Sequence, residues 1–283
     1  MKKNSLRAVR FLLFLLALQF ISFSSQAYLR PANQIIEVML TAQQGASGFQ
    51  MRQETEFIDP QFPNGRLSAK EMLYVRRPLA LRLESDNSKF KQTVISRSGK
   101  VMVMTDGIIT EDGNINHGLR TDLFSASETS EVLSRLQSAG IDTGVVSLGR
   151  EKEKIYLVIG VKDGGAKEEQ KKVPQLWVSK SDYMPFKLIV KEKSGAKESW
   201  IEVKFSGYGK GTAKWYPAYV DVFSDGTQIA AIKAKEFRNQ DRLPDDLFDL
   251  EKNRASKTIS KDVRRHGPFS SMQFAEMLDQ LRK

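Results

Sequence analysis

Few side chains in this sequence could do covalent or metal chemistry. The chain contains no cysteine, which excludes disulfides, thiolate nucleophiles and cysteine-based metal sites. Its two histidines are His117, inside the turn-rich run 111–118, and His266, inside a basic stretch near the C-terminus. Neither is accompanied by a Gly-x-Ser-x-Gly elbow or a metal-ligand pattern, although a serine–histidine pair can be distant in sequence. We therefore expect no catalytic residue, no metal and no cofactor.

The charged residues also lack an obvious site. Asp245, Asp246 and Asp249 follow Pro244, and such a run is more typical of a solvated turn than of a calcium site. The 44 basic residues exceed the 34 acidic ones, but much of the excess lies in the first 27 residues and in the stretch 252–265. We expect that stretch to be a solvated linker, with attraction to anionic membrane headgroups as the alternative. No nucleic-acid partner is expected.

The N-terminus has the pattern of an export signal. Residues 11–23 form an apolar run after four basic residues, and Ser25-Gln26-Ala27 places small residues at positions −3 and −1 of a cleavage site. The run is shorter than the roughly 20 residues that span a bilayer. We expect cleavage after Ala27 and a periplasmic location.

The elements that must position any site are mostly strands. Phe49, Met51, Thr55 and Phe57 alternate with polar residues, which is typical of a strand with one buried face. In the run 69–84, a single parity carries Leu73, Val75, Leu79, Leu81 and Leu83. Pro78 interrupts this run and predicts a bulge, a turn between two strands or an edge position. Further strands are predicted at 92–96, 100–105, 108–110, 145–148, 155–161, 175–179, 186–192, 200–208, 216–224 and 227–238, the last two joined by an Asp225-Gly226 hairpin turn.

Helices are predicted in three places. Residues 31–40 place Ile35, Ile36, Met39 and Leu40 on one face. Ser125 and Glu128 fit a capping box before a helix with Val132, Leu133 and Leu136 on one face, which Gly140 ends. A short amphipathic helix is predicted after Ser270. A long antiparallel meander with one helix at its start and another in its middle predicts a mainly β (α+β) fold, a curved sheet whose concave side needs covering.

Two groups of residues are candidates for that concave side. Phe49, Met51, Phe57, Met102 and Met104 could line a ligand cavity, where unbranched methionine adapts to varied shapes, or could be ordinary core. Arg77 shares the parity of Leu73 and Val75, so a regular strand would place it on their apolar side, where a guanidinium needs acceptors. The alternative is that Arg77 reaches the sheet edge and contacts solvent or a carboxylate.

Several motifs resemble those of the LolA-type periplasmic lipoprotein carriers. Residues 73–78 read Leu-Tyr-Val-Arg-Arg-Pro, similar to that family's Leu-Trp-Val-Lys-Arg-Pro strand, and Met104-Thr-Asp-Gly107 stands at the place of its Ser-Asp-Gly turn. The later part is similar to the longer outer-membrane lipoprotein-sorting relatives. It runs from Trp177 through Tyr183-Met-Pro-Phe186 and Tyr216-Pro217 to residues 243–248, Leu-Pro-Asp-Asp-Leu-Phe.

The resemblance implies a half-open antiparallel barrel, with helices forming a lid over a cavity for acyl chains. It assigns residues 28–250 to this domain, between a signal peptide (1–27) and a basic linker with a short helix (251–283). The lid latch would be Arg77, the lid helix would carry Val132, Leu133 and Leu136, and the lipid-binding residues would be Phe49, Met51, Leu73, Val75, Leu79, Leu81, Leu83, Met102 and Met104.

The implied function is non-enzymatic: a monomeric carrier of lipid or lipoprotein acyl chains toward the outer membrane. Its partners would be an inner-membrane donor complex and an outer-membrane acceptor. The alternative is an envelope sensor of the RseB type, which reads lipid or lipoprotein signals and regulates a membrane partner.

Overall fold

The computed structural model of the chain describes residues 29–43, 47–89, 91–116, 123–161, 173–194, 197–240, 242–255 and 257–271. Residues 31–283 group into one compact unit. The predicted export signal and the helix predicted beyond residue 271 lie outside the described residues. None of the described helices is long and apolar enough to cross a membrane.

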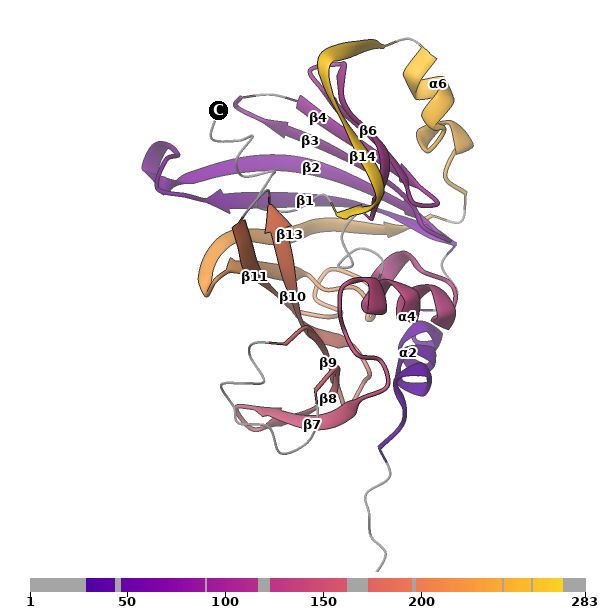
Figure 1. Ribbon diagram of the computed structural model, residues 1–283, viewed down its shortest axis with the longest axis vertical. Helices are drawn as coiled ribbons and strands as arrows, with labels where there is room; N and C mark the ends of the chain where they lie inside the picture. Colours follow the sequence, from indigo (N-terminus) through magenta and orange to yellow (C-terminus); the bar gives the residue numbers. More distant parts are fainter. Residues whose placement is uncertain are drawn as a thin grey trace, which may run out of the picture. The chain divides into compact units, whose positions relative to one another are not determined.

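The described part of this unit is built on a single 14-stranded sheet, with the order β14-β6-β5-β4-β3-β2-β1-β13-β12-β11-β10-β9-β8-β7 (Figure 1). One antiparallel meander comprises β1 (Gly48–Ile58), β2 (Arg66–Arg76), β3 (Ala80–Asn87), β4 (Lys91–Arg97), β5 (Lys100–Thr105) and β6 (Ile108–Asn116). A second comprises β7 (Val146–Glu151), β8 (Lys154–Ile159), β9 (Gln175–Ser179), β10 (Pro185–Ser194), β11 (Lys197–Ser206), β12 (Tyr219–Ser224) and β13 (Thr227–Asn239).

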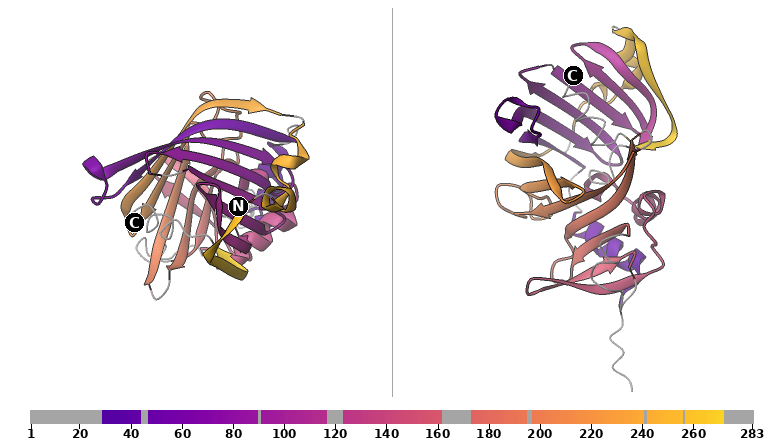
Figure 2. Two further views of the ribbon diagram at one scale, coloured as in Figure 1. Left: turned by 90° about the horizontal axis from the view of Figure 1, so that it is seen from above. Right: turned by 60° about the vertical axis from the view of Figure 1, so that its left-hand side comes forward.

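Pairing between β1 and β13 joins the two meanders, with a register from Phe49 opposite Asn239 to Phe57 opposite Ala230. The sheet is twisted and curved, as Figure 2 shows from two directions. The helices whose bounds fall within the described residues are α2 (Ala32–Thr41), α4 (Thr129–Ser138) and α6 (Leu250–Ala255), with 3-10 turns at Pro63–Gly65 and Asp245–Leu247. The mainly β fold with covering helices is therefore confirmed.

The alternation of the first strands gives the sheet two different faces. The inner face is defined here as the one that carries Phe49, Met51, Leu73 and Val75, all at most 3% exposed. Phe124, just before α4, packs on this face, because it lines a small space together with Met51. The other face, the outer face, carries polar residues such as Arg52 and Glu54 over β1.

The structure contains the turns predicted at Pro78 and at Asp225-Gly226, but one predicted helix begins at a later residue. Residues 77–79 are the turn between β2 and β3, one of the three options that Pro78 left open, and Asp225 and Gly226 both have the positive φ expected of their hairpin. Helix α4 begins later than predicted, because its capping box is made by Glu128 and Glu131 rather than by Ser125 and Glu128.

The prediction for residues 251–271 was wrong. They do not form a linker: after α6, β14 (Thr258–Ser271) runs parallel to β6 and pairs with it, with irregular register. Ser270 belongs to this strand rather than opening a helix. Basic residues here are used in contacts, since Lys252 pairs with Asp246 and Arg254 with Asp112. The basic composition of this stretch suggested a solvated segment. In the fold, acidic neighbours partly neutralise its charge.

Candidate functional site

Two apolar rows cross the inner face of the sheet. Cross-strand pairing aligns the first row, Phe49, Val75 and Leu81, which continues to Ser96 and Val101. It aligns the second row as Met51, Leu73, Leu83, Val94 and Val103. The structure therefore brings together Phe49, Met51, Leu73, Val75, Leu81 and Leu83 from the predicted set. These rows form a continuous apolar wall beside the turn that carries Arg77.

Met102 and Met104 do not belong to this wall, contrary to the prediction. Val101 and Val103 alternate with them, and it is the valines that pack with Val94 on the inner face. The two methionines lie on the outer face in a buried cluster with Ile95 and Ile109, against which Leu250 of α6 and Val263 of β14 pack. The reason is that residues 101–104 are apolar at every position, so alternation could not assign their faces.

Leu79 does not belong to the wall either. It lies in the β2–β3 turn with a φ of 48° and is half-buried. Its N–H donates to the carbonyl of Ser125 at 3.3 Å. Because the turn interrupts the strand at Pro78, the parity shared with Leu73 carries no face information beyond Arg76.

Arg77 is held by acceptors from two distant parts of the chain. Its Nη1 donates to the carbonyl of Gln43, and its Nη2 donates to the side-chain Oε1 of Gln43 and to the carbonyl of Phe124, each at 3.1 Å. The guanidinium carbon lies 4.7 Å from the centroid of the Trp215 ring, a cation–π distance. Burial lowers the pKa of the Arg77 guanidinium from its ordinary value, but an arginine still remains protonated.

These contacts connect three elements. Gln43 follows the C-terminus of α2, is fully buried, and donates from Nε2 to the carbonyl of Leu123 at 3.0 Å. Phe124 directly precedes the segment 125–140, in which the sequence had placed the acceptors. Arg77 thus ties the β2–β3 turn to the end of α2 and to the chain that enters α4. The acceptors are carbonyls, as predicted, but they belong to Gln43 and Phe124 rather than to residues of 125–140, and Arg77 lies in a turn rather than on a regular strand.

Helix α4 presents the predicted apolar residues inward. Val132 and Leu136 are fully buried, and Leu133 is half-buried. The helix packs against α2, whose Ile35, Ile36 and Met39 are also fully buried. Figure 1 shows the two helices side by side.

An aromatic cluster beneath Arg77 was not assigned to the site by sequence reasoning. Phe49 contacts the rings of Trp215, Tyr216 and Phe237 with centroids 4.9–5.5 Å apart, and Phe124 lies 5.0 Å from Tyr216. Offset or edge-on pairs at these distances add to the stability that apolar burial gives. In the sequence, the Tyr216-Pro217 motif could have indicated this aromatic cluster. The contact between Tyr216 and Phe49, however, depends on the pairing of β1 with β13.

Beside this cluster the sheet and the segment before α4 are tightly packed. Met51, Gln53, Phe124, Phe205 and Tyr216 enclose, with neighbouring residues, a space of about 10 Å³, which holds at most one water. An elongated apolar ligand could reach this part of the inner face only if the segment around Phe124 moved. The hydrogen bonds that Arg77 donates to Gln43 and Phe124 oppose such a movement.

The acidic and basic surface residues stay outside this site. Asp245 pairs with Arg76, Asp246 pairs with Lys252, and Asp249 accepts from the Lys252 N–H. Within the described ranges no group of three or more His, Asp or Glu side chains could hold a metal ion. His117 and the side chain of His266 lie outside them.

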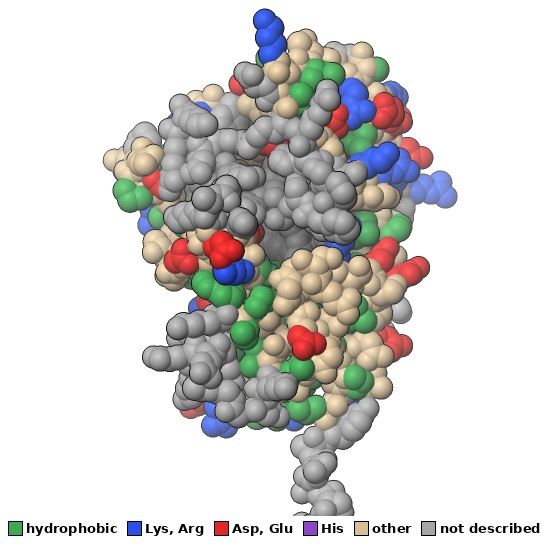
Figure 3. Space-filling view, in the orientation of Figure 1, with side chains coloured by type: hydrophobic (Ala, Val, Ile, Leu, Met, Phe, Trp, Pro, Cys, Tyr) green, Lys and Arg blue, Asp and Glu red, His purple; other side chains and the backbone are tan. Residues whose placement is uncertain are grey.

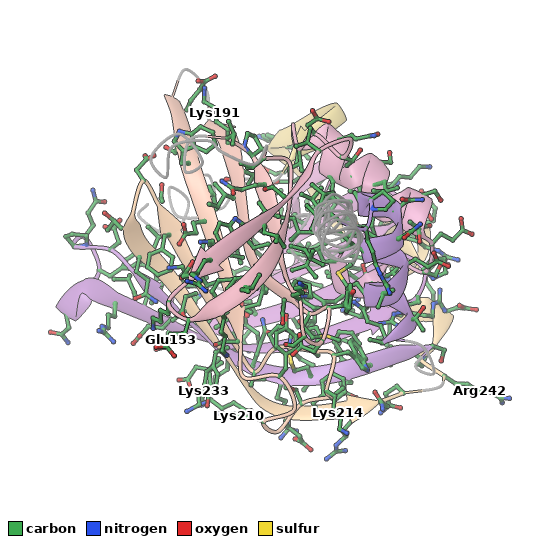
Figure 4. All side chains as sticks on the ribbon, turned by 90° about the horizontal axis from the view of Figure 1, so that it is seen from below. Glu153, Lys191, Lys210, Lys214, Lys233 and Arg242 are labelled. Carbon is green, nitrogen blue, oxygen red and sulfur yellow. The ribbon has the colours of Figure 1, made fainter. Side chains whose placement is uncertain are left out.

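The described surface carries charges of both signs (Figure 3). Lys210, Lys214 and Lys233 extend outward on one side of the sheet (Figure 4). Lys210 and Lys214 come from the β11–β12 loop, and Lys233 of β13 is paired across the strands with Glu54, a residue of the outer face.

Comparisons with known proteins agree with this architecture. No family model and no curated protein matches the sequence. Among solved structures, a LolA superfamily protein from Nitrosomonas europaea is similar at 11% identity with a TM-score of 0.52, covering 79% of this chain and 99% of that one. A DUF1329 family protein from Desulfovibrio piger is similar at 10% identity and a TM-score of 0.50, covering 79% and 99%.

A third similar structure is a domain named for outer membrane lipoprotein sorting from Vibrio parahaemolyticus, at 11% identity, a TM-score of 0.48 and coverage of 78% and 98%. At these identities the likeness concerns the fold. The chain has the fold of the LolA superfamily, the fold that its strand and turn motifs predicted.

Proposed function

We propose that this chain is an exported, periplasmic, non-enzymatic carrier that binds acyl chains of lipids or lipoproteins on the inner face of its sheet. Bound chains would be shielded from water beneath α2 and α4 and delivered toward the outer membrane. The observation that carries the proposal is the apolar wall of the inner face, which ends at an arginine that ties the sheet to both helices.

The physical chemistry of acyl chains supports this assignment. Each buried CH₂ contributes about 0.8 kcal/mol, so an apolar wall of this size supplies ample affinity without charged contacts. Release is then the difficult step. A closure made of a few hydrogen bonds at one turn can be broken without unfolding the sheet, because local opening costs less than global unfolding.

Displacement of a fluorescent fatty acid tests the binding site. Leu81→Glu places a carboxylate in the first apolar row and should weaken binding at least tenfold, because the charge would have to be desolvated beside the ligand. Gln50→Glu puts the same carboxylate on β1 but on the outer face, and it should leave affinity unchanged. Circular dichroism would establish that both variants are folded.

Equal affinities of both variants and the wild type would contradict binding on the inner face.

Mass spectrometry of lipids extracted from the purified protein then identifies the cargo class. Transfer of a bound fluorescent lipid to acceptor vesicles separates the two functions that the sequence left open. Bound ligand that is retained in the presence of acceptors would favour the sensor.

A further inference from the structure

A polar row lies directly beside the apolar wall. One step along the strands from Met51, Leu73, Leu83 and Val94, cross-strand pairing aligns Gln53, Glu71, Ser85 and Gln92 on the same inner face. Consecutive rows on one face are about 7 Å apart along a strand. Glu71 is 8% exposed, Gln53 is 5% exposed and Gln92 is 7% exposed. A wall that only held acyl chains would have no use for this row.

Glu71 is buried without a cation. Its Oε2 accepts a hydrogen bond from Gln53 Nε2 at 2.6 Å and another from Thr55 Oγ1 at 2.5 Å. Both donors are neutral, and no lysine or arginine of the described chain pairs with this carboxylate. Burial of an unpaired carboxylate is costly, so the site favours a ligand that brings a positive charge. Both bonds end on Oε2, which leaves Oε1 able to accept.

Gln92 offers the opposite chemistry on the same row. Its side chain forms no hydrogen bond with any described residue, and its amide atoms are not among the fully buried polar atoms that lack a partner, so they are accessible to solvent and to a ligand. Ser85 stands between Gln92 and Glu71 in the pairing and its hydroxyl is likewise without a partner in the described chain. Gln92 is two strands from Glu71, about 10 Å. The row thus combines the carboxylate of Glu71 with neutral donors on the two following strands.

We propose that the polar row recognises the headgroup of a zwitterionic, amine-bearing lipid such as a phosphoethanolamine lipid. The ammonium group would bind Glu71, and the phosphate oxygens would accept hydrogen bonds from Ser85 and the Gln92 amide. Acyl chains would then extend along the adjacent apolar rows toward Arg77. The inference rests on the proposed function, since it names the lipid class for the same inner face.

The headgroup assignment can be tested with two lysophospholipids that have the same acyl chain. One carries an ethanolamine headgroup and the other a glycerol headgroup, and each is used below its micelle-forming concentration. The readout is displacement of a fluorescent fatty acid. Wild-type protein should prefer the ethanolamine lipid by roughly tenfold, the ratio expected for one charge-assisted hydrogen bond. Glu71→Gln keeps the shape and should remove this preference, so that the two lysophospholipids displace the fatty acid equally well.

Asp86→Asn is the matched control, because it removes one carboxylate next to Ser85 from an exposed position on the outer face. It should retain the preference. Gln92→Leu is a second variant that leaves Glu71 and its two donors intact. It should weaken both lysophospholipids relative to the fatty acid.

Equal binding of the two lysophospholipids by wild-type protein would overturn the headgroup assignment and leave the proposed function standing. An unchanged ratio of lysophospholipid to fatty-acid affinity in Gln92→Leu would overturn the phosphate contact. Failure of every probe, the fatty acid included, to bind the wild type would instead overturn the proposed function.

Discussion

Arg77 shows how one residue can link elements that lie far apart in sequence. Its acceptors include the main-chain carbonyl just beyond α2, and helix C-termini carry a partial negative charge that favours a cation. The planar guanidinium can donate to Gln43 and to Phe124 at once, whereas the smaller ammonium of lysine acts as a point charge. The geometry of the site therefore depends on arginine specifically.

Replacing Arg77 should loosen the segment before α4. In Arg77→Leu the carbonyls of Gln43 and Phe124 lose a donor, at a cost of about 1–3 kcal/mol, partly offset because a desolvated charge is removed. Amide exchange across residues 123–138 should accelerate, with a small loss of thermal stability. Arg77→Lys keeps the charge and should have an intermediate effect. Wild-type exchange in both variants would remove Arg77 from the proposed closure.

At the scale of elements, α6 and β14 complete the outer face of the first meander. Arg254 donates to both carboxylate oxygens of Asp112, at 2.6 and 2.8 Å, while Leu250 and Val263 pack on the buried methionines. Strand β14 also covers the edge of β6, which would otherwise present unpaired backbone groups. The C-terminal elements therefore support the sheet from the side opposite the proposed ligand.

Two substitutions, one on each face of the sheet, separate the roles of the two faces. Met102 is fully buried on the outer face, so Met102→Ala should lower the free energy of unfolding by about 2–5 kcal/mol and leave fatty-acid affinity unchanged. Leu83 is half-buried on the inner face, so Leu83→Ala should cost less stability and weaken binding. Urea unfolding and ligand displacement measure both effects. Weaker binding in folded Met102→Ala would return that residue to the ligand site.

At the scale of the whole molecule, pairing of β1 with β13 is the contact that makes one sheet of two meanders. The paired residues are 173 to 190 positions apart in sequence, from Phe57 with Ala230 to Phe49 with Asn239. The same pairing places Phe237 against Phe49 and brings Trp215 and Tyr216 beneath Arg77. The site therefore forms only when both meanders have associated.

Processing is a property of the whole chain that intact mass can test. The basic start, short apolar run and Ser25-Gln26-Ala27 predict a mature N-terminus at Tyr28 when the full sequence is expressed in an exporting bacterium. The periplasmic fraction should contain that species. A protein that keeps residues 1–27 would contradict the free-carrier proposal, because the apolar run would then hold it at the membrane.

The sequence alone determined what local pattern can encode. Alternation located the strands, Pro78 and Asp225-Gly226 located turns, and the spacing of apolar residues located α2 and α4, because each of these signals depends on neighbours within one element. The need of a buried guanidinium for acceptors also indicated carbonyls near the helix predicted at 125–140, but the parity of Arg77 with Leu73 could not fix its face, because the chain turns after Arg76.

Only the tertiary structure decided which elements meet. In the run 101–104 every position is apolar, so the sequence could not show that Val101 and Val103 face inward while Met102 and Met104 pack under α6. The charge of 252–265 concealed a strand, because its partner β6 is more than 100 residues away. Gln53, Glu71 and Gln92 lie on three strands and look like unremarkable polar residues until cross-strand register aligns them. Register between distant strands depends on the packing of the whole sheet, and local pattern does not contain it.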